Sequence, residues 1–195
     1  MCTFGLFSMV IVLLYTKEIE GGRNMQAIAT FEKVSFTQFK KDWVQTFGAT
    51  SEQKLKEIYE AILLPKRATK SSAGYDIFAP ISFVLNPQKE IFLPTGIRCH
   101  MDEGWTMLLF SRSGLGTKFY VRLATCVSVI DGDYYYANNE GHIFIKVRNE
   151  GTQNVPVEIS AGSGFAQGVF VPFGVTTNDT ADGERVGGFG STTKA

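Results

Sequence analysis

Residues 127–136 combine an apolar run with two carboxylates and three tyrosines, a combination that could support hydrolysis of a flat substrate. The valines and Ile130 favour a β-strand, and Asp131-Gly132 is typical of a tight turn. Asp131 would therefore lie where a strand ends and aromatic rings begin. There it could take a proton from water while a ring holds the substrate beside it. A hairpin turn with a solvated aspartate explains these ten residues equally well.

The motif Ser-Arg-Ser-Gly-Leu-Gly at residues 111–116 follows an apolar run and is rich in hydrogen-bond donors. Its hydroxyl groups, the fork of Arg112 and the backbone N–H groups of a glycine-containing turn suit phosphate oxygens. It is not a P-loop, because Gly-Lys-Ser/Thr is absent from the sequence. We therefore expect a phosphate-binding loop of another kind.

Asp76 and Gln167 are two polar residues that could serve the same ligand. Asp76 follows Gly74 at an expected strand start, where a carboxylate could hold Mg²⁺ through water, as this ion prefers. Gln167 places an amide on a strand just past the turn at residues 162–164. Alone, each residue is explained more simply by a turn or a surface hydrogen bond, so a functional role for either depends on the other motifs.

The motif at residues 185–193 has a composition that a packed core would not use. Phe189 lies among three glycines, with Arg185 and several hydroxyl-bearing residues around it. A flap of this kind could close over a ligand, with Arg185 binding phosphate and Phe189 stacking on a base. A disordered tail is the simpler alternative.

After Pro65, short apolar runs alternate with turn signals, which predicts an antiparallel sandwich or barrel. His142 opens one of these runs and is expected on a strand surface rather than as a metal ligand. The expected strands are 81–85, 90–93, 105–110, 127–130, 142–148, 155–159 and 165–171.

Residues 25–64 are predicted to form a short strand followed by a helical appendage. Ser35 and Gln38 have the spacing of a capping box, which would open a helix that ends at Gly48. A second helix is expected to begin near Ser51. Two apolar stripes predict that the appendage docks on the body or on a neighbouring subunit: Phe36, Phe39, Trp43 and Phe47 in the first helix, and Leu55, Ile58, Tyr59 and Ile62 in the second.

Residues 1–24 form an apolar N-terminal extension. The run at 4–15 is shorter than the roughly 20 residues that span a bilayer, and it lacks the charged leading region and cleavage site of a secretory peptide. We therefore expect Met25 to be the working start and no stable membrane insertion. A weak anchor is the alternative.

The composition argues against several classes of protein. Lys and Arg total 19, as do Asp and Glu, and the net charge of zero argues against nucleic-acid binding. Cys2, Cys99 and Cys126 are widely spaced and form no CxxC pair, so neither a disulfide framework nor a zinc site is expected. A reducing, cytoplasmic compartment is expected.

The five motifs, in this order and spacing, resemble those of the trimeric dUTPases. The resemblance covers about residues 64–193, and residues 31–35 and 133–142 are similar to the dUTPases of Firmicutes and their phages. It implies a mainly β fold, a jelly-roll-like β-barrel with a short helical N-terminal segment. The barrel is expected over residues 65–177, followed at 178–195 by a mobile C-terminal arm that closes the active site.

The resemblance further implies a homotrimeric enzyme whose sites each draw on three subunits. It would hydrolyse dUTP to dUMP and pyrophosphate by Mg²⁺-assisted attack of water on the α-phosphate, limiting uracil in DNA and supplying dUMP. Asp131 is the expected base, Asp76 would hold Mg²⁺ through water, and Tyr134 would pack under the deoxyribose and exclude a 2′-hydroxyl. The other expected substrate-binding residues are Arg112, Ser113 and Gly114 at the phosphates, Thr125, Val129 and Ile130 at the base, Gln167 near the substrate, and Arg185, Phe189, Gly190, Ser191 and Thr192 in the arm.

Thr125 and Ser128 depart from the family pattern, which often has asparagine and glycine at these places. Threonine offers one hydrogen bond where asparagine offers a pair, so pairing with uracil is expected to depend on the backbone of residues 129–131. Two alternative functions remain open. One is a regulator-binding protein that uses residues 135–139 or the appendage; the other, less favoured, is a dCTP deaminase, which needs a glutamate beside the base.

Overall fold

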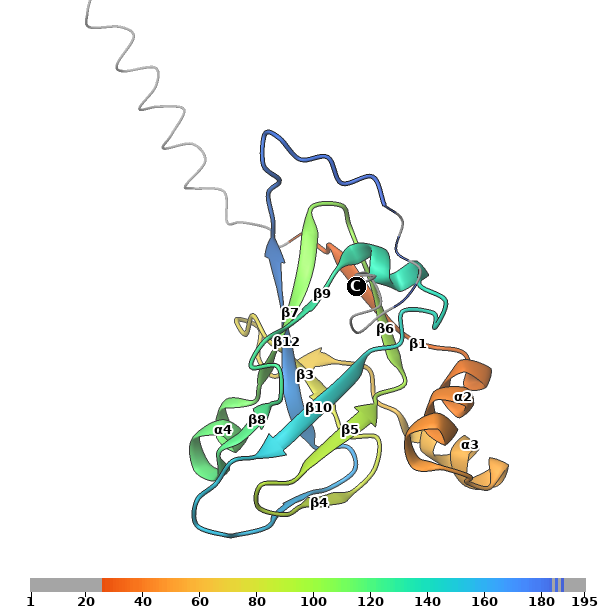
Figure 1. The fold of residues 1–195 in the computed structure, drawn as a ribbon, viewed down its shortest axis with the longest axis vertical. Helices are drawn as coiled ribbons and strands as arrows, with labels where there is room; N and C mark the ends of the chain where they lie inside the picture. Colours follow the sequence, from red (N-terminus) through yellow and green to blue (C-terminus); the bar gives the residue numbers. More distant parts are fainter. Residues whose placement is uncertain (1–25, 184, 186, 188–195) are drawn as a thin grey trace, which may run out of the picture.

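The computed structural model describes residues 26–183 together with Arg185 and Gly187, and strands dominate it (Figure 1). Its helices are α2 (Phe36–Phe47), α3 (Glu52–Ala61), α4 (Ser113–Phe119) and the 3-10 helix η1 (Gly132–Tyr136). Its strands are β1 (Ala29–Lys33), β2 (Lys66–Arg67), β3 (Tyr75–Phe78), β4 (Phe83–Leu85), β5 (Glu90–Pro94), β6 (Ile97–Met101), β7 (Trp105–Ser111), β8 (Val121–Leu123), β9 (Ser128–Ile130), β10 (Phe144–Asn149), β11 (Val157–Ile159) and β12 (Gly164–Pro172).

The strands pair antiparallel in four small sheets. The largest has the order β2-β3-β12-β7-β9, and a second has the order β5-β10-β8. Two-stranded pairs, β1-β6 and β11-β4, complete the body. The predicted mainly β fold is confirmed, and each of the seven runs predicted as strands contains one. Strands β2, β6 and β8 had not been predicted.

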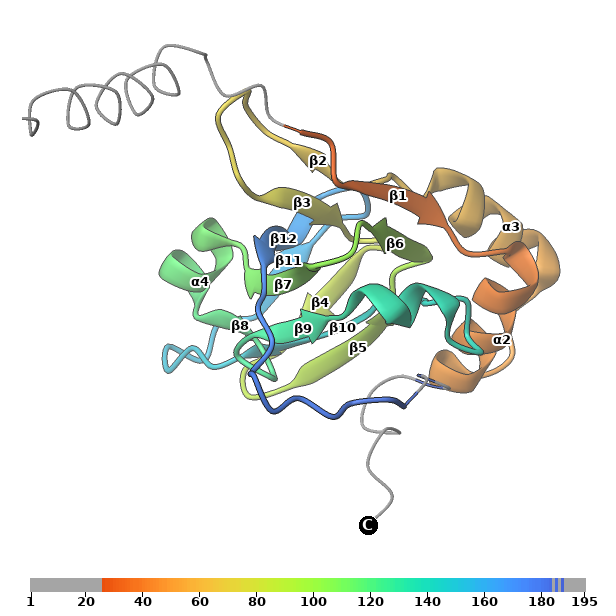
Figure 2. The ribbon, with the colours of Figure 1, turned by 90° about the horizontal axis from the view of Figure 1, so that it is seen from above.

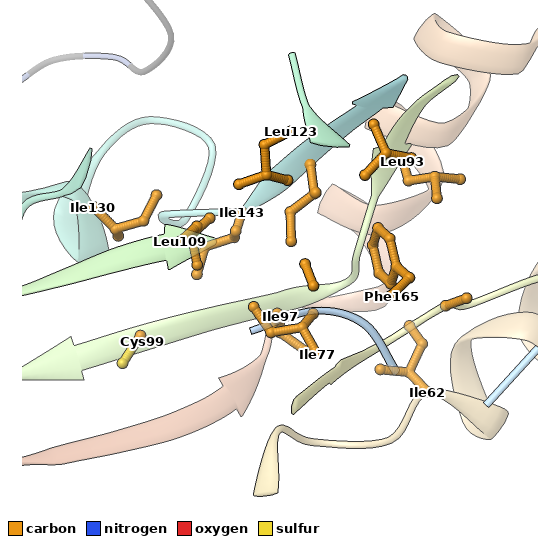
Figure 3. Close-up of a cluster of buried hydrophobic side chains, with 14 of the residues drawn as sticks. Ile62, Ile77, Leu93, Ile97, Cys99, Leu109, Leu123, Ile130, Ile143 and Phe165 are labelled. Carbon is orange, nitrogen blue, oxygen red and sulfur yellow. The ribbon is translucent and has the colours of Figure 1, made fainter. Parts of the chain in front are cut away.

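The core lies between these sheets (Figure 3), and alternate residues of β6 and β10 are buried in it. The core cluster includes Leu109 of β7, Phe165 of β12, Leu93 of β5 and Ile145 of β10, and all four side chains are at most 2 % exposed. Burying an aliphatic or aromatic side chain of this size stabilises a fold by about 1.5–3 kcal/mol. The packed core therefore holds β7 and β9, which carry the candidate site, in a fixed place.

The N-terminal appendage packs against the body of its own chain, with α2 beside β5 (Figures 1 and 2). Phe39 and Leu55 are fully buried, as their apolar stripes predicted. Only half of the expected capping box forms: the Ser35 hydroxyl accepts the Gln38 N–H (3.1 Å), but the Gln38 side chain turns to Asp42 instead. The other half of the cap is supplied from far along the chain, by Glu140.

None of the helices within residues 26–183 is long and apolar enough to cross a bilayer. The expectation for residues 1–24 lies outside the described residues.

Candidate functional site

Asp131 is the first residue past β9, at a point that β7 holds in place. The Thr106 hydroxyl donates to the Ile130 carbonyl (2.8 Å), and the register sets Ile130 opposite Met107. The chain then enters η1, so the alternative of a hairpin turn at Asp131-Gly132 is wrong. The change matters because one short helical turn brings Tyr134 back beside Asp131.

A pocket of about 310 Å³ opens beside the Asp131 carboxylate. At one wall, the Thr125 and Ser128 hydroxyls share a hydrogen bond of 2.6 Å. The pocket is lined by Thr125, Val127, Ser128, Val129, Ile130, Asp131, Tyr134 and Arg185.

Arg185 reaches this pocket from the end of the chain. Its guanidinium forms an ion pair with Asp131 through Nη2 and a second one with Asp133 through Nε (2.9 Å). The same group lies 5.7 Å from the centre of the Tyr134 ring. Two of the five predicted motifs therefore meet within one chain. The arm residues Phe189, Gly190, Ser191 and Thr192 lie outside the described residues.

Tyr134 is held rigidly, with 3 % of its surface exposed. Its hydroxyl donates to the His142 carbonyl (2.6 Å) and accepts from the Asn139 side chain (2.8 Å). Burial raises the pKa of this phenol, so the ring stays neutral and presents an apolar surface at neutral pH. Such a ring suits packing against a sugar rather than proton transfer.

Asp76, Arg112 and Gln167 form a second cluster, at the other end of the five-stranded sheet. The register of β3 and β12 sets Asp76 opposite Gln167, and Asp76 forms an ion pair with Arg112 (3.1 Å). Gln167 donates to the Ser111 carbonyl (3.1 Å). A Cβ added at Gly164 would lie 3.3 Å from the Arg112 guanidinium, so glycine leaves room for the arginine.

Ser113 and Gly114 do not lie in a loop, because α4 begins directly after Arg112. A pocket of about 300 Å³ lies beside this point and is lined in part by Arg112, Gly114 and Lys118. Within the described residues, no three acidic, histidine or cysteine side chains group as metal ligands do. A cation here would therefore take Asp76 as its protein carboxylate and most of its ligands from water and phosphate, which suits Mg²⁺.

The two clusters are separate within one chain. Thr106, beside Asp131, and Arg112 stand six residues apart along β7, or about 20 Å at the rise of a strand. The predicted site residues thus fall into two groups, which one chain does not bring together. We call them the carboxylate pocket, around Asp131, and the phosphate cluster of Asp76, Arg112 and Gln167.

Two residues that contact the lining of the carboxylate pocket were missed or misplaced by sequence reasoning. Asp133 binds Arg185, which no spacing rule indicated. His142 was predicted on a strand surface, and this is wrong: it is fully buried just before β10, where its ring contacts Phe144 (4.6 Å between centroids). Its place at the start of an apolar run was the only local signal.

Gly141 offers a direct test of how tightly the loop after Tyr134 is packed. Its φ is +69°, and an added Cβ would lie 2.7 Å from the Tyr134 carbonyl and the Tyr135 Cα. We expect Gly141→Ala to lower the free energy of unfolding by roughly 2–4 kcal/mol in urea titrations. Gly104→Ala is the matched control, because Gly104 has φ +80° but open space around it. It should cost only about 1 kcal/mol, and equal losses would contradict the packing argument.

Comparison with known proteins shows which family the chain is similar to. The dUTPase family model matches residues 60–193. The deoxyuridine 5'-triphosphate nucleotidohydrolase of Lactococcus lactis is 41% identical over 134 residues, covering 67% of this chain and 88% of the relative. The crystal structure of a dUTPase from Streptococcus mutans aligns with a TM-score of 0.56 at 33% identity, covering 76% of this chain and 98% of that one.

Phage enzymes share the fold at lower identity. A mutant dUTPase from phage phi11 of S. aureus, which coordinates a structural Mg(II) ion, aligns with a TM-score of 0.56 at 21% identity over 80% of this chain and 98% of that one. A dUTPase of Staphylococcus bacteriophage 80alpha, from a group that controls transfer of virulence genes, aligns with a TM-score of 0.55 at 20% identity, over 81% and 98%. At these identities the likeness concerns the fold alone.

Proposed function

The chain belongs to the dUTPase family, and on that premise we propose that it hydrolyses dUTP to dUMP and pyrophosphate. The observation that carries this proposal is the pocket where Asp131 stands beside the buried ring of Tyr134. A carboxylate and an apolar ring are what the reaction needs, because water must lose a proton while the nucleoside is held still.

In this reaction Asp131 acts as the general base toward the attacking water. Its side chain is 45% exposed, so water can reach it. Arg185 neutralises it without a ligand, and incoming phosphates would compete for the same guanidinium. When Arg185 turns to the phosphates, the Asp131 carboxylate becomes free to accept a proton at its oxygen. Binding of the substrate and activation of the base would then be one event.

The residues that line the pocket would select the uracil base and the deoxyribose of the substrate. Strand β9 forms an edge of its sheet, and an edge strand presents backbone N–H and C=O groups that can pair with uracil. Because the Thr125 and Ser128 hydroxyls bind each other, these backbone groups are the better candidates. Tyr134 would pack against the deoxyribose, where an added 2′-hydroxyl meets an apolar ring and no partner.

The phosphate cluster supplies the opposite side of the substrate. Arg112 would bind phosphate oxygens, with Ser113 and Gly114 at the start of α4 and Gln167 nearby. Mg²⁺, held by Asp76 through water, would mask negative charge on the triphosphate. Because Asp131 and Arg112 are about 20 Å apart in one chain, a complete site needs residues from more than one subunit, which supports a homotrimer.

A pyrophosphate-release assay tests the function. We expect turnover of dUTP with Mg²⁺, little without it, and much weaker turnover of UTP, dTTP and dCTP. Equal rates on UTP and dUTP would remove Tyr134 from its role. Ammonia release from dCTP would indicate a deaminase, although none of the described residues lining the pocket is a glutamate.

A second candidate role is binding of a regulator protein on the same scaffold. Tyr136 is 71% exposed beside the site, next to a depression of about 790 Å³ that also includes Trp105 and Phe173. An exposed aromatic patch of this kind fits a protein partner. A pull-down from host extract with Tyr136→Ala beside the wild type would test it.

We place the protein in the cytoplasm, because Cys99 and Cys126 are both free thiols.

A further inference from the structure

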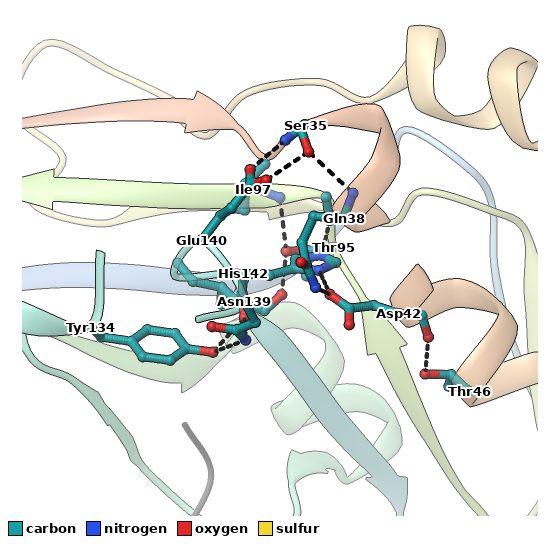
Figure 4. A network of polar contacts seen from close by, with 12 residues as sticks. Ser35, Gln38, Asp42, Thr46, Thr95, Ile97, Tyr134, Asn139, Glu140 and His142 are labelled. Atoms are coloured by element: carbon teal, nitrogen blue, oxygen red, sulfur yellow. Dashed lines mark hydrogen bonds and ion pairs between the residues drawn. The ribbon is translucent and has the colours of Figure 1, made fainter. Parts of the chain in front are cut away.

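The loop of residues 131–142, here called the site loop, is fastened to the N-terminal segment at three points. The Tyr135 hydroxyl donates to Glu32 (2.8 Å). Glu140 accepts both the N–H (2.7 Å) and the hydroxyl (2.6 Å) of Ser35, at the start of α2. The third point joins His142 to Asp42 (2.6 Å; Figure 4). Contacts of this number and kind make the segment part of the loop's framework rather than a loose extension.

The third point is the buried one. His142 is fully buried and Asp42 is 6 % exposed. The His142 Nε2 accepts the Gly96 N–H (2.8 Å), so the proton must be on Nδ1, which donates to Asp42. Asp42 in turn accepts from the Gln38 side chain (2.8 Å). The imidazole is therefore fixed on both sides, by the body and by the appendage.

His142 also contacts Tyr134, through its backbone. The carbonyl of His142 accepts the Tyr134 hydroxyl (2.6 Å), and Asn139 donates to the same hydroxyl. A shift of the His142 backbone would move the acceptor that fixes the phenol, and with it the ring that lines the pocket. A chain of contacts thus leads from Asp42 through His142 to Tyr134 (Figure 4).

We propose that Asp42 is a positioning residue of the enzyme, acting through His142 to set the place of the Tyr134 ring and so the preference for deoxyribose. The part that concerns sugar preference rests on the proposed function. The appendage then contributes to selectivity without touching the substrate. The contrasting interpretation is that Asp42 only anchors α2, in which case its loss changes stability and leaves the pocket as it was.

The test compares Asp42→Ala with Asp42→Asn, whose amide oxygen can still accept the Nδ1 proton. Lys40→Ala is the matched control, because Lys40 lies on the same helix and pairs only with Glu52 among the described contacts. Two readouts are needed: the ratio of kcat/KM for dUTP over UTP, and the NMR signal of Tyr134 in protein labelled at the tyrosine ring, assigned with Tyr134→Phe. Thermal melting of each variant reports the anchoring role separately.

For Asp42→Ala we expect the dUTP preference to fall by about tenfold, mainly through KM, and the Tyr134 signal to shift. Asp42→Asn and Lys40→Ala should keep both values. A folded Asp42→Ala protein with the wild-type ratio and the wild-type Tyr134 signal would overturn the proposal. If that variant does not fold, Gln38→Ala replaces it: a smaller shift of the same signal supports the coupling, and no shift refutes it.

The two proposals can fail separately. If the wild type does not hydrolyse dUTP but its Tyr134 signal still responds to Asp42→Ala, the function is wrong and the coupling stands. If the wild type hydrolyses dUTP and neither readout responds, the coupling is wrong and the function stands.

Discussion

Asp131→Asn is expected to lower kcat for dUTP hydrolysis by at least about 100-fold, because asparagine cannot accept the proton of the attacking water. The fold should not change, since Asp131 is 45% exposed and its replacement can still bond to Arg185. Steady-state pyrophosphate release and circular dichroism of the same sample would measure both effects.

Asp133→Asn is the matched control for this experiment. Asp133 also pairs with Arg185 (2.9 Å), so its replacement disturbs the same guanidinium without touching the proposed base. We expect a loss of less than about tenfold, in line with the small value of an exposed ion pair. Equal losses in the two variants would mean that the carboxylates act by holding Arg185, and Asp131 would lose its assignment as base.

The strands that sequence reasoning found are those with dense apolar runs. Strand β6 escaped because Arg98 and His100 alternate with Ile97, Cys99 and Met101, and a five-residue run with two polar positions resembles a loop. Its inward positions are buried all the same, because β6 pairs with β1 and covers the core. Pattern alone could not show this, since the partner lies about 70 residues away in the sequence.

The turn at Asp131 shows local preference yielding to tertiary packing. Asp-Gly favours a two-residue hairpin, but β9 pairs with β7 and the following residues form η1. In η1 the Tyr134 N–H donates to the Asp131 carbonyl (3.2 Å), and the Tyr134 ring becomes buried. Burying that ring and bonding its hydroxyl stabilise the helical turn over the hairpin.

The candidate site was predictable as a set of residues but not as an arrangement. Motif spacing indicated Asp131 and Arg112, yet only the pairing of β9 with β7 shows that the two residues lie beside opposite ends of β7. His142 was misplaced for a similar reason: its partner Asp42 precedes it by 100 residues, and no local period reports such a pair.

Arg112→Ala is expected to lower kcat/KM for dUTP by about 100-fold, because charge-assisted hydrogen bonds to phosphate are among the strongest in proteins. The loss is enlarged by Asp76, because its carboxylate would repel the phosphates once the Arg112 guanidinium beside it is removed. Lys118→Ala is the control, since Lys118 lines the same pocket but forms no described contact with Asp76. It should change kcat/KM by less than about threefold, as expected for an exposed charge.

Mixing the two inactive proteins tests whether one site draws on different subunits. If Asp131 and Arg112 of a site come from neighbouring subunits of a ring of three, each trimer that contains both Asp131→Asn and Arg112→Ala chains has one intact site. Random reassembly at equal amounts should then restore about a quarter of wild-type activity. The two variants assayed without exchange of subunits are the baseline. No gain after exchange, confirmed by mass spectrometry of mixed trimers, would place both residues of a site in one chain, which the 20 Å separation along β7 speaks against.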